Sequence, residues 1–91
     1  MNYSNAMPQV RETFQELTLV VQYFDLSSIN LRGCNLNNAN LKNTSLKDAN
    51  LQQANLSYAN LEQADLKDTK FDGAIFYNTI TPDGSIKNDN L

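Results

Sequence analysis

Few residues of this 91-residue chain have the chemistry of a catalytic site. It contains no histidine, so the commonest general base and the commonest metal ligand are both missing. The single cysteine, Cys34, is the only thiol that could act as a nucleophile, and it has no histidine to activate it. It also cannot form an intramolecular disulfide. We therefore expect Cys34 to be a core residue and no catalytic residue to be present.

The charged residues also point away from chemistry. Ten acidic and seven basic side chains give a net charge of −3, and the chain is therefore not basic enough for a phosphate-binding footprint. Paired carboxylates for hydrolysis need a cleft that holds a proton on one of them. Here lysines interrupt the acids, as in Asp65-Leu66-Lys67-Asp68. We expect a solvated surface with no metal, no cofactor and no nucleic-acid partner.

The hydropathy pattern gives no sign of a membrane partner. The longest aliphatic run, residues 19–21, is far too short to span a bilayer. The first twenty residues lack the basic leader and apolar core of a signal peptide, so the sequence predicts a cytoplasmic protein.

A repeat of five residues organises most of the chain. Leucine stands at every fifth position from Leu26 to Leu66, and Phe71 and Phe76 continue the series. The residue two before each of them is mostly small, and the residue directly before is polar except Ile75. Eleven such pentapeptides cover residues 24–78, and 91 residues are too few for a second core.

A period of five fits neither a regular helix nor a regular strand. On an α-helix a five-residue step turns the leucine by about 140°, so no single buried stripe forms. On a strand an odd period moves the leucine to the opposite face at each repeat. We therefore predict a square coil: the small residue and the leucine point inward, and the last two residues of each pentapeptide turn a corner.

The corner residues support this geometry. Seven of the eleven residues that stand two after the leucine are Gly, Asn or Asp, which tolerate a positive φ in tight turns. Gln53, Tyr58 and Gln63 are the least suited to such turns, and we expect strained or different corners there.

These features resemble the pentapeptide-repeat family, whose motif is A(D/N)LXX. The close matches are AlaAsnLeuLysAsn at 39–43, AlaAsnLeuGlnGln at 49–53, AlaAsnLeuSerTyr at 54–58, AlaAsnLeuGluGln at 59–63 and AlaAspLeuLysAsp at 64–68. The resemblance implies an all-β fold, a right-handed quadrilateral β-helix with four pentapeptides per coil, here just under three coils. Members are abundant in cyanobacteria, most have no assigned activity, and none is known to us as an enzyme through its repeats.

The two ends differ from the repeat. In residues 1–23 the apolar spacing predicts a helix near 8–18 that caps the first coil. Phe24 and Ile29 are expected to form the surface on which this helix packs. Alternatively, Leu19–Val21 is the inward pair of a degenerate repeat. Residues 79–91 are expected to form a turn at Thr81-Pro82-Asp83-Gly84 and a loosely held tail, which crosses the last coil through Ile86.

Four pentapeptides per coil would stack residues that are twenty apart. This register predicts ladders of amide hydrogen bonds between stacked asparagines, such as Asn30 and Asn50. It also places Lys42 against Glu62, and it puts Tyr58 and Tyr77 on one wall. Because exposed aromatic residues are enriched at interfaces, these two tyrosines are the candidate interaction surface.

The sequence thus predicts a non-catalytic structural or protein-interaction module with a protein partner, and it leaves open an end-to-end homodimer. The family resemblance supplies an alternative, a DNA-mimic regulator that binds a type II topoisomerase. That activity requires a long, dimeric and dominantly acidic rod, whereas this chain is short and its acids alternate with lysines.

Overall fold

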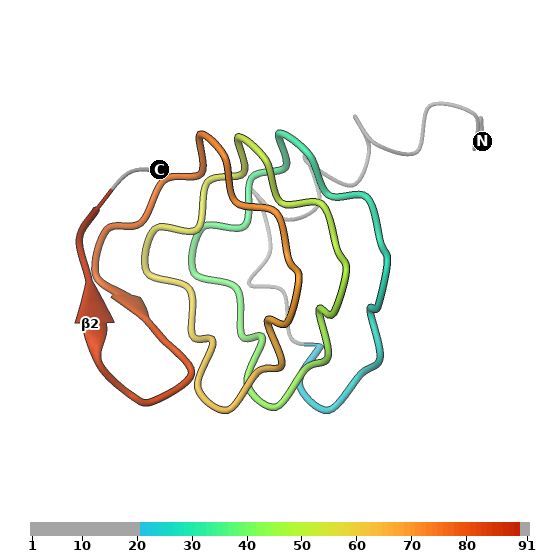
Figure 1. The fold of residues 1–91 in the computed structure, drawn as a ribbon. Coiled ribbons are helices and arrows are strands. Elements are labelled where there is room, and N and C mark those ends of the chain that lie inside the picture. The colour runs from blue at the N-terminus through green and yellow to red at the C-terminus, as the bar shows by residue number, and fades with distance from the viewer. Residues whose placement is uncertain (1–20, 90–91) are drawn as a thin grey trace, which may run out of the picture.

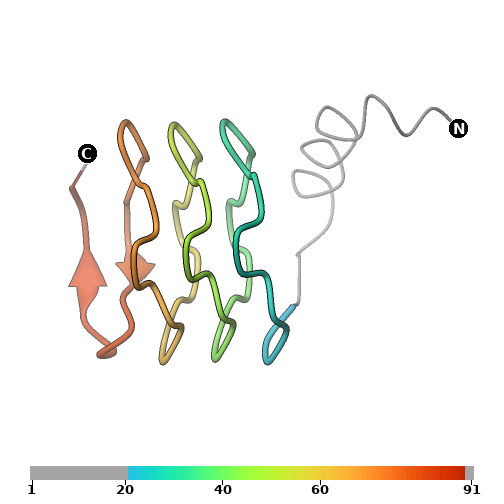
Figure 2. The ribbon, with the colours of Figure 1, turned by 45° about the vertical axis from the view of Figure 1, so that its right-hand side comes forward.

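The computed structural model describes residues 21–89, and over this range the chain winds into successive turns that stack side by side (Figures 1 and 2). Parallel β-bridges join residues that are twenty apart. They are Asp25↔Ser45, Asn30↔Asn50, Asn35↔Asn55, Asn40↔Asn60, Ser45↔Asp65, Asn50↔Lys70, Asn55↔Ile75 and Asn60↔Ile80. Each pentapeptide therefore lies on the pentapeptide four repeats later in the chain.

A backbone hydrogen-bond ladder holds neighbouring turns together. The N–H of Leu31 donates to the carbonyl of Asn50 at 2.8 Å, and the N–H of Gly33 donates to that of Gln52 at 2.8 Å. In the opposite direction, the N–H of Asn50 donates to the carbonyl of Ile29 at 2.9 Å. This set repeats along the interior of the stack, so the backbone groups there are paired although most of the chain forms no continuous strand.

The core lies on the axis of the coil, as the sequence predicts. Leu41 and Leu56 are both fully buried, and so is every leucine between them. The small residues that stand two before the leucines, here called the small column, are also buried from Cys34 to Ala64. Leu26 and Leu66, at the two ends of the leucine series, are only partly buried and pack against this core.

Threonine replaces alanine in the small column without leaving a polar group unpaired. The hydroxyl of Thr79 donates to the carbonyl of Leu56 at 2.7 Å, and that of Thr44 donates to the carbonyl of Val21 at 2.9 Å. Both threonines are fully buried. Because each hydroxyl has an acceptor, its burial carries little penalty.

Every corner has the same backbone conformation. At each corner from Tyr23 to Asn78, the residue two after the leucine or its equivalent has a positive φ, between 49° and 75°. The N–H of the next residue usually donates to the carbonyl of that leucine, as the N–H of Ala54 does to Leu51 at 3.1 Å. These are the features of a type II turn. Of the two alternatives expected at Gln53, Tyr58 and Gln63, a different corner is wrong, because their φ values are 62°, 62° and 59°. A strained corner is what the structure has, since these residues hold a left-handed φ without being glycine.

The ladder explains why these unfavourable residues obey the same geometry. The N–H of Gln53 donates to the carbonyl of Asp72 at 2.8 Å, and this bond exists only if the corner matches those of the adjacent turns. A left-handed conformation costs a residue other than glycine about 1–2 kcal/mol. The hydrogen bonds and the packing of the stack outweigh that cost.

The coil pattern is already present at the first described residue. Tyr23 has a φ of 69°, and the N–H of Val21 donates to the carbonyl of Asn40 at 3.1 Å. This observation places Val21 in a repeat ahead of the expected start at residue 24. The predicted helix near 8–18 lies outside the described residues. Of the two residues expected to pack against that helix, Phe24 is exposed and Ile29 is half-buried.

A short hairpin ends the coil. β1 (Thr79–Ile80) pairs antiparallel with β2 (Ile86–Lys87), so the tail folds back and is held more closely than expected. The predicted turn is confirmed by a bond from the N–H of Gly84 to the carbonyl of Thr81 at 2.9 Å. Within it, the Thr81 hydroxyl and then the N–H of Ser85 lower the pKa of Asp83 to about 2.

We predict that two opposite changes of volume in the core both destabilise the fold. Leu51→Ala leaves a cavity and is expected to lower the free energy of unfolding by about 2–5 kcal/mol. Ala54→Leu overfills the small column and is expected to cost about 1–3 kcal/mol. Urea denaturation measures both, and an unchanged midpoint for either variant contradicts its inward position.

A second prediction concerns the corners. Gln53→Gly relieves the left-handed strain and is expected to stabilise the fold by about 1 kcal/mol. Ser57→Gly is the control, because Ser57 is a turn residue outside the positive-φ set, and it is expected to cost about 0.5–1 kcal/mol. Urea denaturation compares the two variants with the original protein. If Gln53→Gly destabilises the fold, the assignment of strain to this corner is wrong.

Candidate interaction surface

The twenty-residue register divides the outer surface into four walls, each made of three stacked pentapeptides. Wall 1 contains residues 24–28, 44–48 and 64–68, wall 2 contains 29–33, 49–53 and 69–73, wall 3 contains 34–38, 54–58 and 74–78, and wall 4 contains 39–43, 59–63 and 79–83. Walls 1, 2 and 4 all carry acidic and basic residues. Wall 3 carries none.

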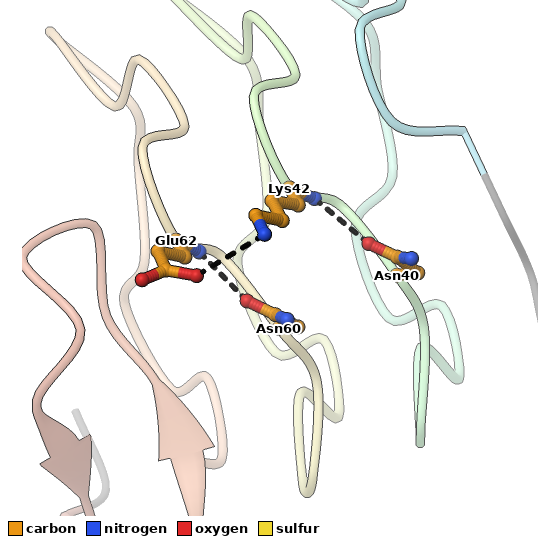
Figure 3. Close-up of polar contacts among 4 residues, drawn as sticks. All are labelled: Asn40, Lys42, Asn60 and Glu62. Carbon is orange, nitrogen blue, oxygen red and sulfur yellow. Dashed lines mark hydrogen bonds and ion pairs between the residues drawn. The ribbon is translucent and has the colours of Figure 1, made fainter.

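On two of the charged walls, side chains of neighbouring turns form polar contacts. On wall 4 the Lys42 Nζ lies 3.5 Å from the Glu62 Oε1 of the next turn, which confirms the predicted pair (Figure 3). On wall 2 the Arg32 guanidinium donates to the Gln52 Oε1 at 2.8 Å, and the Gln52 amide donates to Asp72 at 3.0 Å. Because these contacts are exposed, they contribute little to stability and mainly neutralise the surface.

The asparagines before the leucines do not form the expected ladder. Figure 3 shows the Oδ1 of Asn40 and of Asn60 each accepting the backbone N–H two residues later, from Lys42 at 3.1 Å and from Glu62 at 2.9 Å. Asn55 makes the same bond on wall 3. The prediction of amide hydrogen bonds between coils is wrong, because the Asn oxygen binds within its own repeat. An Asn or Asp at this position thus pairs a turn N–H that points away from the ladder.

In the last repeat of wall 3, an isoleucine replaces this polar residue. Ile75 offers no acceptor, and the N–H of Tyr77 instead donates to the Thr79 Oγ1 at 3.2 Å. The buried Thr79 hydroxyl thus accepts from Tyr77 and also donates to the carbonyl of Leu56 in the preceding turn of the coil. The position directly before the core residue Phe76 is therefore free to present an apolar side chain.

Exposed apolar and aromatic groups gather on this wall. Tyr58 and Tyr77 are each 51% exposed, and Ile75 is 40% exposed. The two tyrosine rings contact each other edge to face, with centroids 5.5 Å apart and an interplanar angle of 81°. The backbone ladder fixes their spacing, because the N–H of Tyr58 donates to the carbonyl of Tyr77 at 2.7 Å. The structure thus brings the two predicted residues together.

The remaining candidate chemistry is buried or dispersed. Cys34 has no exposed surface, so its side chain is inaccessible to a substrate from outside. Within residues 21–89 no three His, Cys, Asp or Glu side chains come close enough to hold a metal ion. The same part of the chain has no helix with the length and apolar character needed to cross a bilayer.

Sequence reasoning identified the tyrosines but missed the wall around them. The absence of charge becomes visible only when the pentapeptides at 34–38, 54–58 and 74–78 are read together at a step of twenty. Ile75 was a second signal, since it alone breaks the polar column with an exposed apolar residue.

Comparison with known proteins supports the coil geometry. A family model described as pentapeptide repeats (8 copies) matches residues 25–57 and 45–80. Among solved structures, the chain is similar to the pentapeptide repeat protein Rfr23 from the cyanobacterium Cyanothece 51142, with 35% identity, a TM-score of 0.53, and coverage of 68% of this chain and 46% of that chain. It is also similar to HetL, a pentapeptide repeat protein involved in heterocyst differentiation regulation from Nostoc sp. strain PCC 7120. That match has 32% identity, a TM-score of 0.43, and coverage of 75% and 40%.

The chain therefore spans less than half the length of these two structures. No match was found among curated proteins. The family match together with the Rfr23 likeness implies that the coil is a right-handed β-helix.

Proposed function

Because this chain belongs to the pentapeptide-repeat family, whose members are generally structural or interaction modules, we propose that it is a non-catalytic module that binds a protein partner through wall 3. The observation that carries this proposal is the exposed Tyr58–Tyr77 pair on the one wall without charged residues. Wall 3 carries no Asp, Glu, Lys, Arg or His, and its one thiol, Cys34, is buried.

Three properties of wall 3 favour a protein as the partner. Interface centres are depleted in charged residues and enriched in tyrosine, because charges are costly to desolvate while a tyrosine buries a large ring and keeps a polar group. The wall is built from Asn, Ser and Tyr around one isoleucine, a composition that resembles antibody binding loops. The hydrogen-bonded corners hold these side chains in place before binding, which reduces the entropy lost in the complex.

The size of wall 3 limits the partner. Its three stacked rungs are separated by about 4.8 Å each, so the wall alone is smaller than the roughly 800 Å² per partner of a standard interface. The contact that fits is a short uncharged segment of a partner protein.

The proposal includes the finer organisation of the chain. We place the eleven leucine- or phenylalanine-centred repeats at residues 24–78, in just under three coils, after a segment at 1–23 with a capping helix near 8–18 and before a turn and tail at 79–91. The bonds of Val21 and Tyr23 to Asn40 and Lys42 and the bridge of Ile80 to Asn60 extend the coil geometry beyond both bounds. The regular corners and the columns of buried residues support the repeat region.

We predict that one negative charge on wall 3 abolishes partner binding. A photo-crosslinking amino acid at Ser57 is expected to capture a discrete partner from a lysate of the host organism, and Tyr77→Asp is expected to reduce that capture at least roughly tenfold, because the new carboxylate would be buried unpaired. Lys47→Glu on wall 1 is the matched control and is expected to leave capture unchanged. Equal loss in both variants, or no wall-specific product, contradicts the proposal.

The topoisomerase alternative has a separate test. Walls 1, 2 and 4 each carry basic as well as acidic residues, and such a surface lacks the single-sign field that imitates a DNA backbone. We predict that the protein, titrated to micromolar concentration, neither inhibits supercoiling by DNA gyrase nor protects the enzyme from a quinolone. Inhibition or protection in this range favours the DNA-mimic role instead.

A further inference from the structure

The last corner of wall 3 lacks a hydrogen bond that the corners before it have. From residues 21–24 to residues 71–74, the N–H of the fourth residue of each corner donates to the carbonyl of the first, at 2.8 to 3.2 Å. At residues 76–79, within the described part of the chain, the N–H of Thr79 makes no such bond to the carbonyl of Phe76. This corner carries Tyr77 of the exposed tyrosine pair, so other contacts must hold Tyr77 in place.

The side chain of Thr79 supplies two bonds in this place. Its Oγ1 accepts the N–H of Tyr77 at 3.2 Å, and its hydroxyl donates to the carbonyl of Leu56 at 2.7 Å. The carbonyl of Tyr77 is a more distant acceptor, at 3.5 Å. Because Leu56 stands two residues before Tyr58, one fully buried hydroxyl joins the two repeats that carry the tyrosines.

Two other threonines of the small column make only the second of these bonds. The hydroxyl of Thr44 donates to the carbonyl of Val21 at 2.9 Å, and that of Thr69 donates to the carbonyl of Leu46 at 2.7 Å. In both repeats the Asn or Asp that precedes the leucine accepts the turn N–H instead. Within residues 21–89, Thr79 is thus the one threonine whose side-chain oxygen accepts a turn N–H.

This turn N–H does not need a protein acceptor where water can reach it. Ser45 and Lys70 occupy the position of Ile75 in their own repeats. Within residues 21–89, the turn N–H groups that follow them, on Lys47 and Asp72, have no acceptor. Both residues are exposed and lie on the charged walls 1 and 2, so the coil folds without this bond. On a wall that a partner covers, the water is excluded and an unpaired N–H is costly.

We propose that Thr79 is the positioning residue of wall 3. Its buried hydroxyl pairs the N–H of Tyr77 from inside the coil, so a partner can cover the wall and leave no donor unpaired. The same bond lets Ile75 present an apolar side chain, and it holds the Tyr77 corner in place before binding. Thr79 acts through Tyr77 and has no exposed surface of its own. This role rests on the proposed function of wall 3.

Replacement of the hydroxyl by a methyl group tests the bond. Thr79→Val keeps the shape of the side chain, and Thr44→Val is the matched control, because it removes the same kind of bond from another fully buried threonine. In amide hydrogen exchange followed by NMR, the Tyr77 amide is expected to exchange at least roughly tenfold faster in Thr79→Val and at an unchanged rate in Thr44→Val. The amide of Leu36, which donates to the carbonyl of Asn55, is expected to stay protected in both variants and reports an intact fold.

A second substitution is expected to return the lost bond. Ile75→Asn places an amide oxygen where Asn55, one turn earlier, accepts the N–H of Ser57 at 3.0 Å. In combination with Thr79→Val, it is expected to restore slow exchange of the Tyr77 amide. An unchanged Tyr77 amide in Thr79→Val, or no restoration in the double variant, overturns the assignment of this bond.

Partner binding is measured with the photo-crosslinking amino acid at Ser57 in a lysate of the host organism. Thr79→Val is expected to lower capture at least roughly fivefold, because covering the wall then leaves the Tyr77 N–H unpaired, and Thr44→Val is expected to leave capture unchanged. Full capture by Thr79→Val, or equal loss in both variants, overturns the role of Thr79 while the proposed function stands. If the original protein captures no discrete partner, the proposed function fails and the binding role of Thr79 fails with it.

Discussion

The backbone ladder between residues that are twenty apart is the constraint on which the rest of the molecule depends. It joins Leu31 to Asn50 and Asn50 back to Ile29, and the same bonds recur through the interior of the stack. A ladder of this kind forms only if every pentapeptide turns by the same amount. It therefore imposes one conformation on all corners, including residues such as Tyr58 that would not adopt a left-handed φ on their own.

The same constraint determines what the surface can do. Since the axis of residues 21–89 is filled by leucine and small residues, the outer walls present side chains on a rigid grid. The proposed function depends on which residues share a wall. The charged residues lie on walls 1, 2 and 4, and Tyr58, Ile75 and Tyr77 lie on wall 3. Within residues 21–89, backbone N–H donors remain unpaired where the ladder stops.

Much of this architecture could be read from the sequence because the repeat is nearly perfect. The spacing of the leucines excludes a helix and places Leu41 and Leu56 in the core, and the stacking of Lys42 on Glu62 follows from the twenty-residue step. The hydrogen bonds of the Asn side chains were not predicted, because the Asn50 Oδ1 accepts the N–H of Gln52 within its own repeat at 3.0 Å. The spacing of the asparagines alone does not reveal which donor their oxygens bind. The hairpin was also underestimated, since its pairing depends on the unpaired edge of the last turn rather than on a motif of its own.

The most direct test of the account is detection of the ladder bonds themselves. NMR scalar couplings across hydrogen bonds are predicted between the amide nitrogen of Leu31 and the carbonyl carbon of Asn50, and between those of Leu36 and Asn55, each nineteen residues apart. Couplings from these amides to carbonyls four residues earlier, as in a helix, or to a register other than nineteen, would contradict the stacked coil and everything inferred from its walls.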